Sequence, residues 1–201
     1  MTERLVKKII MSPRTEKQNR QIRMEMESKI IDSALELFAN EGYNGTSMQA
    51  IAIKSGVSKG NLYNYFKSKN DLLEGVLVAG LNQFSGFYDQ YANKLIDEET
   101  FEKVIKGNFK MIKENTSFWK LYFNLVVQPK VQELFTKIFS PFLEQYFGIF
   151  ETYFKNKGDK NPNATALLLG SSLDGISLGY IVMGDLYPLE EVLEQLIYKF
   201  K

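Results

Sequence analysis

Apolar residues recur at spacings of three and four along almost the whole chain, and the prolines and glycines fall between these segments more often than within them. This period is typical of helices that bury one face. The pattern therefore predicts an all-α protein, with Pro141 bending one of its longer helices. The expected helices cover residues 20–40, 47–55, 58–66, 68–93, 99–115, 117–127, 130–156, 162–184 and 189–200.

The ends of the first helices are marked by local motifs. Gly42 suits a left-handed position after the first helix, and Thr46, three residues before Gln49, has the spacing of a capping box for the second. Gly56 predicts a tight turn, and Ser58 can cap the third helix. A helix, a short helix, a glycine-containing turn and another helix make up a helix-turn-helix, whose last helix enters the major groove of DNA.

The third expected helix has the polar residues that such a role requires. No acidic residue lies between Ser55 and Asn70, whereas an ordinary solvent-facing helix is usually rich in glutamate as well as lysine. Lysine reaches guanine edges or phosphates, asparagine pairs with adenine edges, and tyrosine hydroxyls donate to phosphates. For any single residue, simple solvation stays an open alternative. The expected DNA contacts are Thr46, Ser47, Ser58, Lys59, Gly60, Asn61, Tyr63, Asn64, Tyr65, Lys67 and Lys69.

Five of these contacts have roles other than reading bases. Thr46 and Ser47 would offer a hydroxyl and free amides to a phosphate at the start of the second helix. Gly60 would let the backbone approach the DNA closely. The two lysines after the third helix would add salt-dependent phosphate contacts.

Residues 28–75 resemble the tetracycline-repressor (TetR) family in about twenty positions that agree in order and spacing. The resemblance is carried by segments 30–38, 41–47, 51–52, 55–60, 62–63, 65–66, 68–69 and 72–73. It implies a fold of about nine helices, a two-fold dimer and an effector that releases the protein from DNA. Asn64 stands where members of the family often have histidine, which puts the operator preference in doubt more than DNA binding.

Composition and charge narrow the function further. Residues 1–70 hold 12 lysines and arginines against 7 acidic residues, although the whole chain has a net charge of only +1. Such an asymmetry suggests that the N-terminal part faces nucleic acid. The chain has no cysteine and no histidine, and it lacks a phosphate-binding glycine-rich loop. We therefore expect no enzymatic activity, no metal and no cofactor.

These observations predict three parts. Residues 1–19 would form a basic, flexible extension, residues 20–68 the helix-turn-helix domain, and residues 69–201 a helical domain for effector binding and dimerisation. The first 25 residues lack the apolar core of a signal peptide, so we expect a cytoplasmic protein.

The second domain is rich in aromatic residues, which could line an apolar cavity, although any individual ring could equally belong to the core. Buried tyrosine and tryptophan need polar partners, so neighbouring amides are useful markers of a pocket. With no histidine and few charges in these stretches, a neutral or amphipathic organic effector fits better than a metal ion. The expected ligand contacts are Phe87, Tyr91, Trp119, Tyr122, Asn124 and Gln128.

Residues 164–184 contain a single charge, Asp174, and are long enough to span a membrane. The central charge and several glycines and serines argue against this interpretation. We expect instead that this helix and helix 189–200 pair across a two-fold axis, while an intrachain core helix remains the alternative. The expected interface residues are Gly170, Asp174, Ser177, Ile181, Val192 and Leu196.

Together these features predict a homodimeric repressor that binds double-stranded operator DNA and is released by a small apolar or amphipathic molecule. The alternative is a dimeric helix-turn-helix regulator with no small-molecule switch, or an activator.

Overall fold

The structure is a computed structural model that describes residues 15–92, 94–129 and 131–201. Within these ranges the chain forms nine α-helices and one short 3-10 helix, and no strand. The prediction of an all-α fold with about nine helices is therefore confirmed, and most expected boundaries agree within one or two residues. The helices are α1 (Glu16–Glu41), α2 (Met48–Ser55), α3 (Lys59–Tyr65), α4 (Lys69–Asp89), α5 (Glu98–Glu114), α6 (Thr116–Val126), α7 (Gln132–Asn156), α8 (Pro162–Met183) and α9 (Leu189–Phe200), with η1 (Gly184–Leu186) after α8.

Two helix starts differ from the expectation. Helix α1 begins four residues early, because Thr15 and Gln18 form a reciprocal capping box. Residues 16–19 are therefore helical, and the rest of the expected extension, residues 1–14, lies outside the described residues. Helix α2 is capped by Ser47, which accepts from the amide of Ala50, and not by Thr46.

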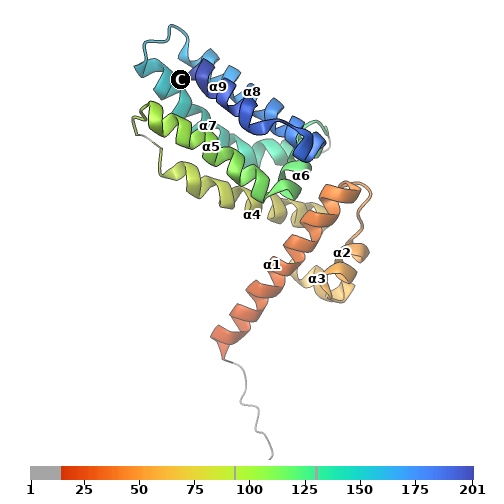
Figure 1. Cartoon of the computed structure of the whole chain (residues 1–201). Coiled ribbons are helices and arrows are strands. Elements are labelled where there is room, and N and C mark those ends of the chain that lie inside the picture. The colour runs from red at the N-terminus through yellow and green to blue at the C-terminus, as the bar shows by residue number, and fades with distance from the viewer. Residues whose placement is uncertain (1–14, 93, 130) are drawn as a thin grey trace, which may run out of the picture.

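Helices α1, α2 and α3 form a small unit at one end of the molecule (Figure 1). Gly56 ends α2 with a φ of 73° and donates its amide to the carbonyls of Ala52 and Ile53, which is the left-handed turn that the sequence predicts. The side chains of Ile30, Phe38 and Leu62 are fully buried between the three helices. This packing leaves the opposite side of α3 facing solvent.

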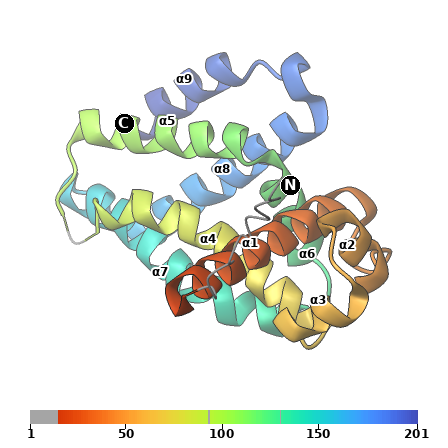
Figure 2. The same cartoon turned by 90° about the horizontal axis from the view of Figure 1, so that it is seen from below.

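Helices α4 to α9 form a bundle around α7 (Figure 2). Helix α7 packs against α4, α6 and α8, and α9 covers α8 and α5. The buried apolar residues divide into two clusters, and the cluster of the helix-turn-helix unit continues through α4 and α6 to Phe139 of α7. Helix α4 is therefore part of both units, and the expected division at residue 68 stays a prediction.

Helix α6 connects the two units. It packs against α1 on one side and against α7 and α8 on the other. Where α6 meets α4, the ring of Phe118 fills the space above Gly80, so closely that a β-carbon at position 80 would lie 1.9 Å from a ring atom. This contact fixes the distance between α4 and α6.

Candidate DNA-binding surface and effector pocket

The solvent-facing side of α3 presents the residues that the sequence selects. Lys59, Gly60, Asn61 and Asn64 are exposed, and Tyr63 keeps 43% of its surface accessible. The only side-chain hydrogen bond among these residues in the described structure is a long one of 3.4 Å between the amides of the two asparagines. A β-carbon at position 60 would meet nothing within 4 Å. The geometry therefore leaves these groups available to a groove.

Two of the expected phosphate contacts have structural roles instead. Thr46 is 2% exposed, and its hydroxyl donates to the carbonyls of Leu37 and Gly42. The ammonium of Lys69 donates to the carbonyls of Tyr43 and Thr46 at 2.7 and 2.9 Å and lies over the Tyr43 ring. Burial lowers the pKa of Lys69. The expectation that these two side chains are free to contact phosphate is therefore wrong: Thr46 holds the loop between α1 and α2 against the end of α1, and Lys69 holds the same loop against α4.

The two neighbouring lysines allow a matched test. Replacing Lys69 with methionine should lower the free energy of unfolding by about 1 kcal/mol, because two carbonyls lose a charged donor and regain only partial hydration. Replacing the exposed Lys67 with methionine should leave stability unchanged and reduce the salt dependence of DNA binding by about one ion. Urea denaturation and binding titrations at several salt concentrations would measure both effects. Equal stability of the two variants would contradict the structural role of Lys69.

Helix α1 adds basic residues that the sequence analysis did not select. The guanidinium of Arg23 lies 5.4 Å from the centre of the Tyr65 ring, beside α3. Lys17 and Arg20 are exposed on the preceding turns. The early start of α1 explains the omission of Lys17 alone, which was expected to lie in the extension, whereas the proximity of Arg23 to Tyr65 is a contact between residues far apart in the sequence. A positive strip on α1 thus borders the surface of α3.

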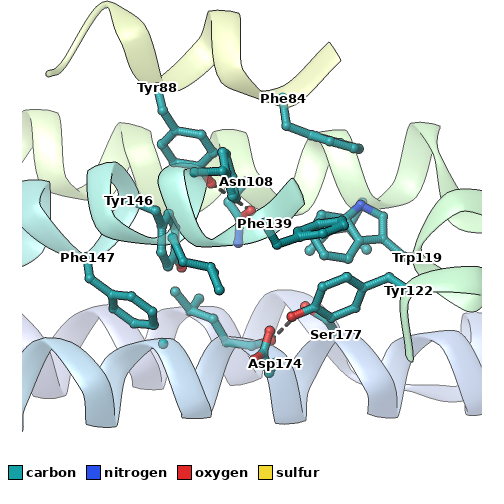
Figure 3. A pocket seen from close by; sticks show the side chains of 15 residues that line it. Phe84, Tyr88, Asn108, Trp119, Tyr122, Phe139, Tyr146, Phe147, Asp174 and Ser177 are labelled. Atoms are coloured by element: carbon teal, nitrogen blue, oxygen red, sulfur yellow. Dashed lines mark hydrogen bonds between the residues drawn. The ribbon is translucent and has the colours of Figure 1, made fainter. Parts of the chain in front are cut away.

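A pocket lies in the middle of the second unit, between α4, α5, α6, α7 and α8 (Figure 3). Its empty volume is about 560 Å³, a figure that includes the part open to solvent. Most of the walls are aromatic. The lining residues are Phe84, Tyr88, Asn108, Ile112, Trp119, Tyr122, Phe139, Phe142, Leu143, Tyr146, Phe147, Gly170, Leu173, Asp174 and Ser177.

The polar groups of this pocket are few. The hydroxyl of Tyr88 donates to the side-chain oxygen of Asn108 at 2.8 Å, and burial raises the pKa of Tyr88 far above its usual range. The indole Nε1 of Trp119 is buried and has no hydrogen-bond partner among the described residues. Asp174 is solvent-exposed as a residue, yet surrounding atoms desolvate its carboxyl group and raise its pKa from 3.8 to about 6.

The structure places only two of the expected ligand contacts, Trp119 and Tyr122, at this pocket. Phe87 packs over Gly107 of α5, and the Tyr91 ring makes an edge-to-face contact with the Phe87 ring. The side-chain amides of Asn124 and Gln128 donate to carbonyls one turn earlier in the chain, those of Lys120 and Asn124 itself. These four residues lie outside the pocket, so placing them there was wrong.

Sequence reasoning missed the residues that α5 and α7 contribute. Asn108 is 8% exposed and occupies a position of the apolar stripe of α5. A polar residue at an apolar position of a helical pattern is the feature by which it could have been found.

The expected interface residues on α8 lie mainly inside the subunit. A β-carbon at Gly170 would lie 2.4 Å from the Phe147 ring, and Ser177 is 2% exposed, its hydroxyl donating to the carbonyl of Leu173. On α9, Leu196 is also buried. The exposed apolar stripe of α8 is a different one. Asp174, Ile181 and Val192 keep part of their surface accessible, so the expected pairing across a two-fold axis stays a prediction. The exposed stripe comprises Ala164, Leu167, Leu168, Ser171, Gly175, Leu178 and Val182, with Asp174 at its border.

No group of three or more acidic side chains that could hold a metal ion occurs in the described ranges. An all-helical chain with an exposed helix-turn-helix and a separate helical body has the architecture of a helix-turn-helix transcriptional regulator. Residues 30–76 match the family model "Bacterial regulatory proteins, tetR family". This match places the helix-turn-helix unit in that family of DNA-binding domains.

Similar proteins agree with this match. The chain is 41% identical over 76 residues to an uncharacterized transcriptional regulator of Bacillus subtilis, YuxN, a match that covers 38% of this chain and 24% of the relative. It is 27% identical over 133 residues to a transcriptional repressor of Rhodococcus jostii, covering 64% and 65%. The chain thus spans between a quarter and two thirds of the length of these curated relatives.

Solved structures show the same fold over almost their whole length. A Clostridium perfringens protein proposed to regulate fatty acid metabolism is 26% identical, with a TM-score of 0.73 and coverage of 86% of this chain and 96% of that one. The Bacillus subtilis regulator FadR, solved in complex with stearoyl-CoA, has 20% identity, the same TM-score and the same coverage. At 20% identity this second likeness concerns the fold.

Proposed function

We propose that the chain is a homodimeric transcriptional repressor that binds operator DNA through α3 and releases it when a small amphipathic molecule enters the pocket. The observation that carries this proposal is the position of α6. Trp119 and Tyr122 line the pocket on one side of α6, and another side of the same helix packs against α1 of the helix-turn-helix unit. A ligand that displaces these rings must also act on the helix that supports the DNA-binding surface.

Homodimerisation supports the same function. Two recognition helices must be about 34–36 Å apart to enter successive major grooves, which one subunit cannot achieve. The exposed apolar stripe of α8 offers a self-complementary surface for a two-fold contact. Its apolar length also qualifies α8 as a membrane span by composition, but the helix packs against α6, α7 and α9 of the same chain. We therefore propose a cytoplasmic dimer.

The dimer surface can be tested by one substitution. Leu178 is 44% exposed on the stripe, and replacing it with glutamate should place two charges in an apolar two-fold contact. We expect the variant to sediment as a monomer and to lose most of its operator affinity. Replacing Leu95, which is 78% exposed on the connection before α5, with glutamate is the matched control and should leave the dimer intact. A dimeric Leu178→Glu variant would contradict the proposed surface.

One similar protein binds an amphipathic molecule, which supports an effector of this kind. FadR of Bacillus subtilis binds stearoyl-CoA in its solved complex, and a curated relative of the same organism, 32% identical over 85 residues, is a fatty acid metabolism regulator protein. An amphipathic effector is consistent with an aromatic pocket that holds few polar groups. Another relative, 29% identical over 116 residues, is a transcriptional activator, so the sign of regulation needs its own test.

A two-stage experiment tests the proposal. Small apolar and amphipathic compounds are screened by thermal shift, and the stabilising ones are added to the complex of the protein with a DNA fragment that it selects from a random pool. Release of DNA by a compound that no longer stabilises a Trp119→Ala variant would support the proposal. Selected DNA that stays bound with every stabilising compound would favour a regulator without a small-molecule switch. Expression of a reporter behind the selected site separates a repressor from an activator.

A further inference from the structure

The pocket contains a single residue that is charged at neutral pH, Asp174 of α8. The other fourteen lining residues are apolar, aromatic or neutral polar side chains, and no lysine or arginine is among them. The eight ion pairs formed by the described residues do not include Asp174. The pocket therefore combines apolar walls with one carboxyl group that has no positive partner in the described part of the chain.

The environment of this carboxyl group makes an unpaired negative charge costly. Its desolvation by neighbouring atoms raises the pKa of Asp174, and no nearby positive group offsets this effect. At pH 7 the group is still mostly ionised, because its pKa of about 6 lies one unit lower. A cation beside the Asp174 carboxylate would provide the positive partner that the described residues do not.

The surrounding rings favour the same kind of ligand. The charge of Asp174 contributes to raising the pKa of both Tyr122 and Tyr146, which places these phenols within its electrostatic reach. Figure 3 shows Tyr122 pointing toward Asp174 from one side of the view, and Tyr146 and Phe147 on the other side. Aromatic faces attract a cation, most strongly where water is excluded.

The α8 helix of a second copy of the chain would not supply a positive charge to Asp174. The helix carries no lysine or arginine between residues 162 and 183, so a symmetric contact of two α8 helices brings no positive charge from that helix to Asp174. Neither the described residues around the pocket nor α8 of a second copy thus supplies the counter-charge.

We propose that the pocket selects a lipophilic monocation, an amine or ammonium attached to an aromatic or aliphatic body, and that Asp174 determines this preference. The proposal rests on the proposed function, because it concerns the same effector pocket. It disfavours fatty acids and acyl thioesters of coenzyme A, whose negative groups would meet an acidic residue and no basic one in this pocket.

Three compounds that share one body and differ in charge test the proposal. They are 4-phenylbutylamine, 4-phenylbutanol and 4-phenylbutyrate, titrated by calorimetry into the full-length protein at pH 7.5. We expect the amine to bind at least about tenfold more tightly than the alcohol, and the acid to bind most weakly, since a desolvated charged hydrogen bond contributes about one such factor. The Asp174→Asn variant should lose this preference for the amine and keep its affinity for the alcohol.

A matched variant and a pH series complete the test. Asp185→Asn, the same change on an exposed residue of η1 outside the pocket, should bind the amine like the unaltered protein. Binding of the amine should weaken as the pH falls through about 6, because protonation removes the charge of Asp174 while the amine stays protonated. The tyrosines that face Asp174 stay neutral in this range because their pKa values are raised, so binding of the alcohol should not change with pH.

Several outcomes would overturn the proposal. These are tighter binding of the acid than of the amine, an unchanged amine affinity in Asp174→Asn, or no binding of any of the three compounds at millimolar concentration. Release of operator DNA by stearoyl-CoA without binding of the amine would also overturn it, while leaving the proposed ligand-responsive function in place. Absence of release by any compound would count against the function itself.

Discussion

Replacing Lys59, Tyr63 and Asn64 with alanine in one variant should weaken binding to a selected DNA site by at least about a hundredfold without changing the stability of the fold. The three side chains are exposed on one side of α3, and none of them packs into the core. A contact to a base edge or a phosphate contributes about 1–3 kcal/mol, so the loss of three contacts exceeds the roughly 2.7 kcal/mol that a hundredfold change requires. Fluorescence anisotropy with the selected fragment measures the loss, and thermal unfolding confirms the fold.

A control that removes positive charge from the other unit separates local contacts from general attraction. Replacing Lys103 and Lys110 with alanine removes two positive charges from exposed positions on α5 in the other unit. This variant should bind the selected fragment within a few fold of the unaltered protein, because screening at physiological salt limits electrostatic effects to about 8 Å. Tight, specific binding by the triple variant of α3 would refute the assignment of the recognition helix.

The helix-turn-helix could be located from the sequence because its boundaries depend on local chemistry. A serine at the start of a helix and a glycine with positive φ at the end act through atoms of the same few residues. The misplaced roles of Thr46 and Lys69 arise from contacts between residues far apart in the sequence. The ammonium of Lys69 reaches carbonyls 23 and 26 positions earlier, and no local pattern reports such a contact.

The burial of some expected interface residues inside the subunit has a different physical reason. Glycines and serines on α8 indicate that another element approaches the helix closely, but they do not indicate from which chain it comes. Gly170 accommodates the Phe147 ring and Gly179 the Tyr187 ring, both of the same subunit. The exposed stripe of leucines and valine on the neighbouring face is the sequence feature that a second chain would have to cover.

The pocket was only partly predictable, because it combines residues from five helices. Trp119 and Tyr122 could be selected together since one turn of α6 separates them. The residues contributed by α5, α7 and α8 join them through helix packing, which periodicity does not specify. Asn124 and Gln128 lie on or just after the same helix, but their amides bond to backbone carbonyls one turn earlier in the chain.

The contact between α4 and α6 is closely packed at Gly80, and two glycines of α4 test its importance. A β-carbon at Gly80 would lie 1.9 Å from the buried Phe118 ring, whereas one at Gly86 would meet nothing within 4 Å. We expect Gly80→Ala to lower the free energy of unfolding by about 2 kcal/mol or more, because the ring must leave a well-packed site. Gly86→Ala should raise it by about 0.5–1 kcal/mol, because alanine has the higher helix propensity.

The opposite signs of these two effects distinguish packing from helix propensity, since both glycines lie within the same helix. Urea denaturation of both variants gives the two free energies, and operator titrations show whether displacement of Phe118 also changes DNA affinity. Helix α6 packs against α1, so Gly80→Ala should weaken DNA binding more than its loss of stability explains, whereas Gly86→Ala should leave DNA binding unchanged. If both variants were equally stable and bound DNA equally well, α6 would not hold the two units in a fixed arrangement, and the mechanism of release through this helix would have to be abandoned.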